Sequence, residues 1–359
     1  MSLKIGIVGL PNVGKSTLFN SLLKKQVAQS ANYPFTTIEP NVGIVEVPDE
    51  KLETLEEVVE KSEGLTPSFK IVPAVVEFVD IAGLVKGAHK GEGLGNKFLS
   101  HIREVDVICF VVRDFKKGDI VNTGTNSIED LEILQSELML KDMEILEKVV
   151  SQLEREIKAL GPNDPARIRF NALKKAYDIV AQGSWLGDNL DKDYLEKVKD
   201  LFLLSAKKKI VVVNCDEEDL KSPAPIDGGI RICAKLEEEI AALSQNEQKE
   251  YLEGLGIRES GLDQLIKVSY GVLGLMSFYT AGPKEVRAWT IIKGATAPKA
   301  AGVIHTDFER GFIAADIVPF DKFVDANGWK GSREKGFVKT IGKAEIMPEN
   351  VVVEFKFSV

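Results

Sequence analysis

The sequence predicts an α/β fold with a mixed, mostly parallel sheet, followed by a strand-rich C-terminal part. Residues 3–8 read as a buried strand, residues 9–16 form a glycine-containing loop, and helical spacing begins at Thr17. Further apolar runs at 44–47, 74–79, 107–112 and 210–213 are separated by turns and helical stretches, which is typical of βαβ construction. From about Ser277 on, strand patterns punctuated by glycine replace the helical ones.

The loop at residues 9–16 reads Gly-Leu-Pro-Asn-Val-Gly-Lys-Ser and fits G-x-x-x-x-G-K-[ST] at every fixed position. Glycine lets the backbone turn its N–H groups toward one point, and the N-terminus of the following helix adds positive partial charge there. In this motif Lys15 reaches the β- and γ-phosphates and the Ser16 hydroxyl holds Mg²⁺. The alternative is an ordinary glycine-rich turn, but it does not explain the full match between correct flanks. We therefore expect the chain to bind a nucleoside triphosphate.

Length and composition restrict the remaining classes. A chain of 359 residues with 44% hydrophobic and 28% charged residues is typical of a soluble protein of two or three domains. No apolar run approaches the roughly 20 residues that span a bilayer, and no secretory signal pattern precedes the first strand. The 3 cysteines have no C-x-x-C spacing, which indicates neither a disulfide framework nor a zinc site. We expect a cytoplasmic protein without a membrane partner. The net charge of −9 argues against DNA binding, although it is compatible with a local basic face.

The other elements of a switch nucleotide site follow in the expected order. Residues 80–83 fit D-x-x-G at the end of an apolar strand, where Asp80 would hold Mg²⁺ through water and the Gly83 amide would sense the γ-phosphate. Between this motif and the phosphate loop, we favour Thr37, with Thr36 next, as the hydroxyl of switch I that completes the Mg²⁺ shell. Ordinary loop polarity is the alternative for the two threonines.

The groups that would position the attacking water are less regular. Leu84 stands where many GTPases have a Gln, and a leucine side chain can neither donate nor accept a hydrogen bond. His89 is a candidate, with a solvated loop histidine as its alternative, in a glycine-rich stretch at 86–96 that we expect to act as a flexible switch II. Lys15 and Asn12 are the other catalytic candidates. In some switch NTPases an Asn at the position of Asn12 helps to bind K⁺ beside the phosphates, and a plain loop asparagine is an equal alternative. We expect slow intrinsic turnover, or water positioned by another group.

Base choice is expected at residues 214–217, Asn-Cys-Asp-Glu, directly after an apolar run. The guanine pattern is N-K-x-D. Here Glu217 replaces the Asp that accepts two hydrogen bonds from guanine, and Cys215 replaces the Lys whose stem covers the base. Adenine still offers its 6-amino group to Asn214 or to a backbone carbonyl. Ala234 lies at the distance of the S-A-K loop, whose backbone also lines the base. These residues weaken guanine selection and permit ATP.

A long helical stretch separates the apolar run at 210–213 from the earlier apolar runs, which end at residue 112. From Ser127 to Leu160, apolar residues recur at three-, four- and seven-residue intervals among many Glu and Lys residues. Residues 127–130 fit a helix start, Gly-Pro-Asn-Asp-Pro at 161–165 is a stop, and a second helix near 166–181 would return as an antiparallel partner. Two arrangements stay open: an arm inserted in the α/β domain, or helices packed flat on its sheet.

Several segments carry a more specific likeness. They are the phosphate loop, the runs at 32–41 (Asn-Tyr-Pro-Phe-Thr-Thr-Ile-Glu-Pro-Asn) and 78–88, the N-x-x-E at 214–217, and the runs at 280–290 and 300–312. Together they resemble the YchF subfamily of Obg-like ATPases over nearly the whole chain. The resemblance implies a P-loop NTPase domain over 1–126 and 205–276. It also implies an inserted antiparallel helical coiled-coil arm over 127–204 and a C-terminal ubiquitin-like β-grasp (TGS) domain over 277–359.

The resemblance also implies an activity. Members hydrolyse the β–γ phosphoanhydride of ATP with Mg²⁺, associate with ribosomes and affect translation and stress responses. By this resemblance Ser16 and Thr37 bind Mg²⁺ and Cys215 contacts the base, whereas relatives have an apolar residue at position 215 and a His in place of Phe110. The phosphate contacts correspond to Asn12, Val13, Gly14, Lys15, Ser16 and Thr17.

Three functions remain to be compared. The leading interpretation is a ribosome-associated ATPase switch, and the alternatives are a GTP-dependent translational regulator and a non-hydrolysing nucleotide-dependent scaffold. Residues 278–359 carry 12 Lys/Arg against 10 Asp/Glu, a mild excess in the direction expected for contact with RNA. We therefore expect an interaction surface there, and interpret His305, Thr306 and Asp307 as part of it rather than as a catalytic group.

Overall fold

The computed structural model describes residues 3–29, 41–63, 70–81, 95–115 and 126–358. They divide into two compact units. Unit 1 comprises Met1–Lys25, Ile38–Gly43 and Glu77–Leu265, and unit 2 comprises Gln26–Thr37, Ile44–Val76 and Ile266–Val359. The described residues of the candidate nucleotide site belong to unit 1.

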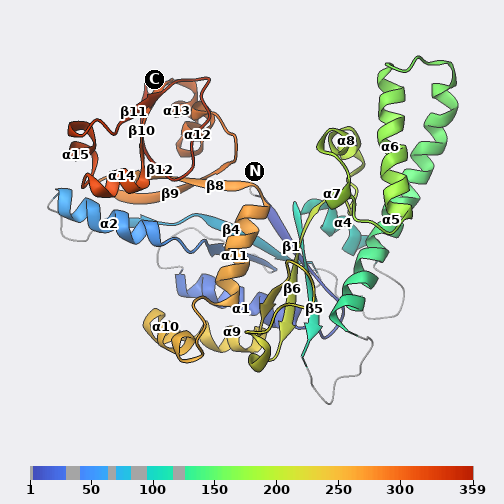
Figure 1. Ribbon diagram of the computed structural model, residues 1–359, viewed down its shortest axis with the longest axis horizontal. Helices are drawn as coiled ribbons and strands as arrows, with labels where there is room; N and C mark the ends of the chain where they lie inside the picture. The colour runs from blue at the N-terminus through green and yellow to red at the C-terminus, as the bar shows by residue number, and fades with distance from the viewer. Residues whose placement is uncertain (1–2, 30–40, 64–69, 82–94, 116–125, 359) are drawn as a thin grey trace. The chain divides into compact units, whose positions relative to one another are not determined.

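The first sheet has the strand order β2-β4-β1-β5-β6-β7. Figure 1 labels β4, β1, β5 and β6 of this sheet. Every pairing from β4 to β7 is parallel. The central strands β1, β5 and β6 are buried over most of their length, as expected for parallel strands covered on both faces, and each apolar run of the sequence analysis appears as a strand. The carboxyl ends of these parallel strands share one edge, where α/β proteins build their sites. The bounds are β1 Lys4–Val8, β2 Val42–Glu46, β4 Val75–Asp80, β5 Val107–Asp114, β6 Lys208–Cys215 and β7 Ile230–Ile232.

Helices connect and cover these strands. Helix α1 follows the phosphate loop directly, and α9 and α10 come after β7. None of the helices in the described parts of the chain combines the length and the apolar character needed to cross a membrane. The bounds are α1 Lys15–Gln29, α4 Asn96–Glu104, α5 Ser127–Glu156, α6 Pro165–Ala181, α7 Leu186–Asn189, α8 Lys192–Val198, α9 Ala234–Ile240, α10 Gln245–Gly254 and α11 Gly261–Val272, with 3₁₀ turns at Ile157–Ala159, Lys199–Leu201 and Glu217–Asp219.

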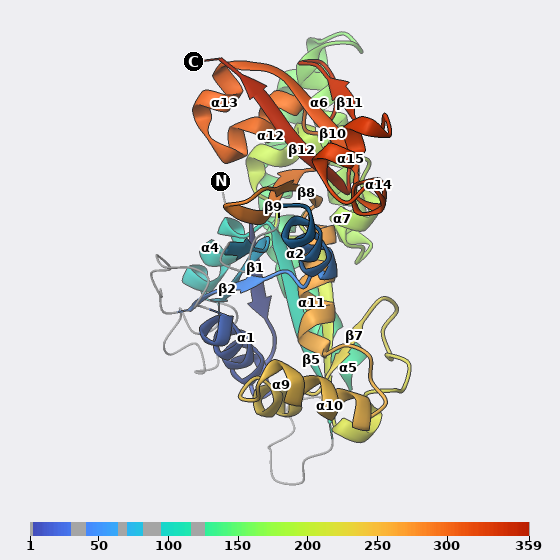
Figure 2. The ribbon, with the colours of Figure 1, turned by 90° about the vertical axis from the view of Figure 1, so that its left-hand side faces the viewer.

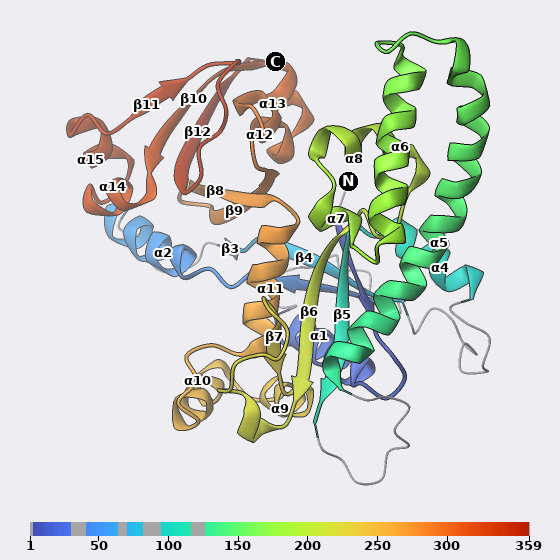
Figure 3. The same cartoon turned by 45° about the vertical axis from the view of Figure 1, so that its right-hand side comes forward.

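The long helix α5 and its partner α6 combine both arrangements that the sequence left open. Asn126 starts α5, because its side chain accepts hydrogen bonds from the N–H groups of Ile128 and Glu129, each at 3.0 Å. The fully buried side chains of α5 end at Leu146 and share a core with the sheet, whereas its remaining residues are at most partly buried. The outer halves of α5 and α6 lie side by side beyond the sheet (Figure 3). The inner half is thus packed on the domain and the outer half projects from it.

Unit 2 is built on a second sheet with the order β11-β10-β12-β8-β9-β3. Its first and last strands in the C-terminal region, β8 and β12, lie next to each other in parallel, and α12 packs on β9 and β10 (Figure 2). This arrangement agrees with the expected β-grasp. The bounds are β3 Lys70–Val72, β8 Leu275–Ala281, β9 Glu285–Ile292, β10 Phe312–Pro319, β11 Lys339–Ile341, β12 Val351–Phe357, α2 Glu50–Glu63, α12 Ala297–Ile304, α13 Thr306–Arg310, α14 Phe320–Asp325 and α15 Trp329–Glu334.

Residues 44–76 group with unit 2. The physical reason is strand pairing: β3 pairs with β9 in parallel, and α2 packs against β8 and β9. Short strands such as β3 have too few residues for a periodic signal, so the sequence does not reveal this pairing.

Candidate functional site

The phosphate loop lies between β1 and α1, in the strand–loop–helix order that the motif requires. Two of its glycines are needed for steric reasons. A Cβ on Gly9 would lie 2.4 Å from the Val111 carbonyl oxygen, and one on Gly14, whose φ is 96°, would lie 2.2 Å from Asn214 Nδ2. Asn12 also has a left-handed backbone, with φ of 61°, and is exposed at the tip of the loop.

Lys15 is the buried cation of the site, with 8% of its surface exposed. Its Nζ donates to the Leu10 carbonyl oxygen at 2.6 Å. Burial lowers the pKa of Lys15 to about 8, an effect that the charge of Asp80 partly offsets. Asp80 ends β4 as a buried carboxylate. The structure thus brings the cation of the phosphate loop and the acid of D-x-x-G close enough to interact, although 65 positions separate them in sequence.

The base segments are joined to the phosphate loop by one buried side chain. Asn214 Nδ2 donates to the Val13 carbonyl oxygen at 2.9 Å, and Asn214 Oδ1 accepts from the Ala234 N–H at 3.0 Å. Ser21 of α1 adds a second link, because its Oγ donates to the carbonyl oxygens of Thr17, at 2.9 Å, and Ala234, at 3.4 Å. The predicted site residues of these three segments therefore come together. Because the Asn214 amide already bonds at both ends, a backbone carbonyl is the more available acceptor for an adenine amino group.

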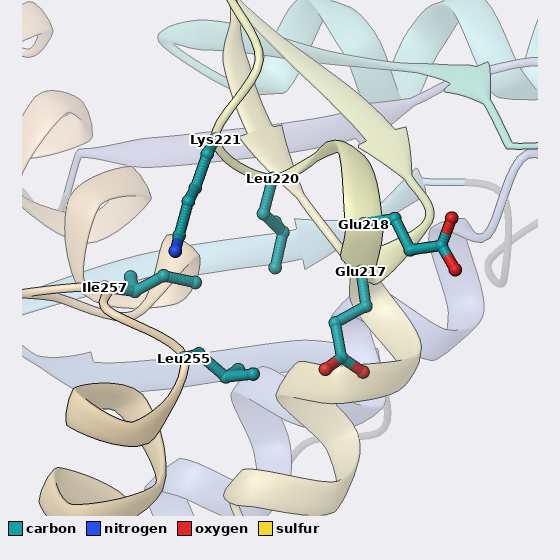
Figure 4. A pocket seen from close by; sticks show the side chains of 6 residues that line it. All are labelled: Glu217, Glu218, Leu220, Lys221, Leu255 and Ile257. Carbon is teal, nitrogen blue, oxygen red and sulfur yellow. The ribbon is translucent and has the colours of Figure 1, made fainter.

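The two residues that depart from the guanine pattern differ in exposure. Cys215 is buried at the end of β6, and Glu217 is exposed. Glu217 lines a small pocket of about 220 Å³ whose apolar side is formed by Leu220, Leu255 and Ile257. Figure 4 shows its carboxylate pointing away from that of Glu218. Glu217 is therefore open to solvent, whereas Asn214 is buried.

Sequence reasoning missed two charged residues beside Cys215. Arg231 of β7 and Asp114 of β5 form an ion pair with Nη2 and Oδ2 2.9 Å apart. The only sequence signal for them is a charge at the end of an apolar run and another inside the short run Ile-Arg-Ile.

Several predicted residues lie outside the described residues: Thr36 and Thr37 of switch I, and Gly83, Leu84 and His89 of switch II. Phe110, where the resemblance in the sequence analysis implies a His, is fully buried and packs edge-on against Trp185 with ring centroids 5.7 Å apart. In unit 2, His305 Nδ1 accepts a hydrogen bond from the Asp307 N–H at 3.2 Å, so it caps the short helix α13.

The donors at the phosphate loop fit Mg²⁺. The ion prefers hard oxygen ligands and keeps several waters in P-loop sites, so it needs few protein groups. The structure supplies the buried Asp80 carboxylate and the exposed Ser16 side chain in the first turn of α1. No cluster of three or more His, Cys, Asp or Glu residues suited to a metal occurs among the described residues, which is compatible with such a sparse site.

Comparisons with known proteins cover the whole chain. Residues 275–358 match the family YchF-GTPase_C, described as a protein of unknown function (DUF933), and residues 4–150 match MMR_HSR1, described as a 50S ribosome-binding GTPase. The proteins named Ribosome-binding ATPase YchF from Bacillus subtilis and Escherichia coli O157:H7 are 44% and 41% identical, each with 100% of both chains covered. A solved structure titled Structure of the Schizosaccharomyces pombe YchF GTPase superposes with a TM-score of 0.87 at 35% identity, covering 99% of this chain and 98% of that one. The expected α/β P-loop fold is thereby confirmed.

Proposed function

The chain belongs to the YchF family, and on this premise we propose that it is a ribosome-associated ATPase switch. The observation that carries the proposal is the Asn214 bridge. Because one side chain holds both Val13 of the phosphate loop and Ala234 of the base segment, a nucleotide that contacts both segments meets a single connected site. Binding there can be transmitted to the switch loops, as in other P-loop switches.

The proposed chemistry is hydrolysis of the β–γ phosphoanhydride of ATP. Backbone N–H groups of the phosphate loop orient the phosphates, and the Lys15 ammonium exchanges the Leu10 carbonyl for β- and γ-phosphate oxygens. Asp80, Ser16 and Thr37 would hold Mg²⁺, which supplies charge neutralisation on those oxygens when bound. Gly83 would sense the γ-phosphate.

We propose adenine as the base. Glu217 and Cys215 support this, because they remove both features with which N-K-x-D selects guanine. The GTP-dependent alternative is favoured by the printed names of the MMR_HSR1 family and of the S. pombe protein. Competition between ATP and GTP for a fluorescent nucleotide decides between them. We expect tighter ATP binding, and tighter GTP binding would overturn the proposed base.

A non-hydrolysing scaffold is the alternative because no residue is yet assigned to position the attacking water. Phe110 is sealed in the core and cannot reach water at the phosphates. We propose slow turnover assisted by K⁺ beside the exposed Asn12. Single-turnover assays with Mg²⁺ and ribosomes should show phosphate release faster in K⁺ than in Na⁺. Equal rates would remove the role of Asn12, and no release at all would favour the scaffold.

The partner we propose is the ribosome or one of its subunits, in the cytoplasm, with no DNA or membrane partner. The domain division at 1–126 with 205–276, 127–204 and 277–359 is likewise a proposal. Sedimentation with purified ribosomal subunits under ATP, ADP and no nucleotide tests the partner. We expect co-sedimentation that depends on the nucleotide, and free protein under all three conditions would refute ribosome association.

A further inference from the structure

The carboxyl ends of β5, β6 and β7 place three side chains in one row. Asp114 pairs in register with Cys215, and Arg231 pairs with Val213, two residues before Cys215. Paired residues of parallel strands, and residues two apart in one strand, point to the same face of a sheet. Asp114, Cys215 and Arg231 therefore lie on one face, with the thiol on the strand between the two charges.

Arg231 spans this row. Its Nη2 lies 2.9 Å from Asp114 Oδ2, two strands away, and its Nε donates to the Pro223 carbonyl oxygen at 3.1 Å. The side chain of Arg231 is only 11% exposed and that of Asp114 is 34% exposed. A planar guanidinium with donors on two sides can hold two acceptors at fixed angles, which a lysine ammonium cannot do equally well.

Cys215 lies beneath this span and is 2% exposed. Burial raises the pKa of its thiol, and the neighbouring Arg231 side chain partly offsets that rise. The thiol is thus a neutral group beside the guanidinium. A small side chain at this position leaves room for the guanidinium to reach Asp114, and the Cys215 backbone begins the turn that contains Glu217.

We propose that Arg231 is a positioning residue for base selection, because its bridge from Asp114 to Pro223 across Cys215 fixes the turn at residues 214–217. This inference rests on the proposed function, since it assumes that a nucleotide base meets that turn. It adds to that function two residues that none of the nucleotide motifs includes.

The test separates contacts to the base from contacts to the phosphates. Affinities for ATP, GTP and inorganic tripolyphosphate are measured by displacement of a fluorescent nucleotide from the full chain and from Arg231→Met. We expect ATP binding to weaken about tenfold, the size expected for one lost charge-assisted hydrogen bond, and the ATP-to-GTP affinity ratio to change. Tripolyphosphate should bind as before. Equal weakening of all three ligands, or an unchanged ratio, would overturn the proposal.

Matched variants exclude a merely structural effect. Lys209→Met removes the ion pair between Lys209 of β6 and Asp188, which lies at the other end of that strand from Cys215, and it should leave the base ratio unchanged. Asp114→Asn should reproduce the ratio change without removing Arg231, and combining it with Arg231→Met should add little. If Arg231→Met does not fold, Asp114→Asn alone tests the proposal. A wild-type ATP-to-GTP affinity ratio in Asp114→Asn would then refute the role of the bridge in base selection.

The wild-type protein separates this inference from the proposed ATPase. A wild-type preference for GTP would refute the proposed base, and the Arg231 variant would still show whether the bridge sets the preference that exists. An unchanged ratio in the variant, with ATP preferred in both proteins, would refute the bridge alone.

Discussion

Lys15 links phosphate recognition to pH through a single proton. Burial lowers the pKa of its ammonium to about 8, close to physiological pH, and the charge of Asp80 partly offsets this effect. Phosphate oxygens beside it would favour the charged form and raise that pKa. ATP affinity should therefore be constant below the free pKa of about 8 and should fall by up to about tenfold per pH unit above it, until the pKa of the bound state is reached.

This expectation is checked by nucleotide affinities between about pH 7.5 and 9.5, with calorimetry in buffers of different ionisation enthalpy to count the proton taken up. Lys24→Met removes an exposed ammonium on the same helix and should keep the slope. An affinity that stays constant across this range would contradict the expectation. It would mean either that Lys15 stays fully charged in the free protein or that ATP binding does not depend on its charge.

Glu237 is a buried acid that makes folding depend on pH. Its Oε1 accepts a hydrogen bond from the Gly261 N–H at 2.7 Å, at the start of α11, and burial raises its pKa from 4.5 to about 7. The folded protein therefore holds this proton to higher pH than the unfolded chain does. Its contribution to stability is greatest below pH 4.5 and is lost as pH rises to about 7, by about 3 kcal/mol in total.

Glu237→Gln should flatten this part of the stability profile, because glutamine has a similar shape and does not titrate. Urea unfolding at about pH 5 and pH 8 measures the difference between the two free energies of unfolding. The neighbouring Glu238→Gln is the control, since Glu238 pairs with Lys24 at the surface. An identical pH dependence in wild type and Glu237→Gln would disprove the assignment.

At the scale of elements, Asp142 attaches α5 to the segment that leads into β6. The carboxylate is fully buried and accepts hydrogen bonds from the Leu204 N–H at 2.8 Å, the Ser205 N–H at 2.7 Å and the Ser205 Oγ at 2.6 Å. It thereby holds the returning chain of the helical insertion against the start of the strand that ends at Asn214 and Cys215.

Asp142→Ala should lower the free energy of unfolding by about 3 to 5 kcal/mol, because three buried donors lose their acceptor. Asp178→Ala on α6 removes only a surface pair with Lys174, 3.0 Å apart, and should cost less than about 1 kcal/mol. Chemical denaturation compares the two. Similar costs would mean that the carboxylate contributes no more than a surface charge.

For the molecule as a whole, the sequence predicted what local periodicity and motif spacing encode. The strand before the phosphate loop, the apolar strands that follow and the long helix ended by Gly-Pro-Asn-Asp-Pro each carry a signal within a few residues. The contacts that complete the site carry no such local signal. Arg231 meets Asp114 only because β5, β6 and β7 are neighbours in the sheet, and Asp142 meets Ser205 across 63 positions. Such pairs depend on strand order and helix packing, which single-sequence patterns do not contain.

The projecting half of the α5–α6 pair belongs to the same scale, because its role concerns a partner rather than the core. Buried residues of α5 stop at Leu146, and those of α6 begin at Ala172. Ile157 is the one buried residue among 148–171, and Val149, Val150 and Leu153 pack only at the margin of the core. Residues 148–171 can be replaced by a flexible linker of about six residues, long enough to join helices about 10 Å apart. We expect nucleotide affinity to stay within about twofold of wild type, since the fully buried residues that the helices share with the sheet are kept.

Ribosome co-sedimentation should decrease in this variant if the projecting half contacts the partner. The matched control keeps the helices and replaces exposed Lys141 and Glu144, which pair with each other on the inner half of α5, by alanine. Because both variants retain the nucleotide site, a change in sedimentation without a change in nucleotide affinity assigns the contact to residues 148–171. Undiminished co-sedimentation of the shortened protein would place the contact elsewhere, and the mildly basic residues 278–359 would then be the next region to test.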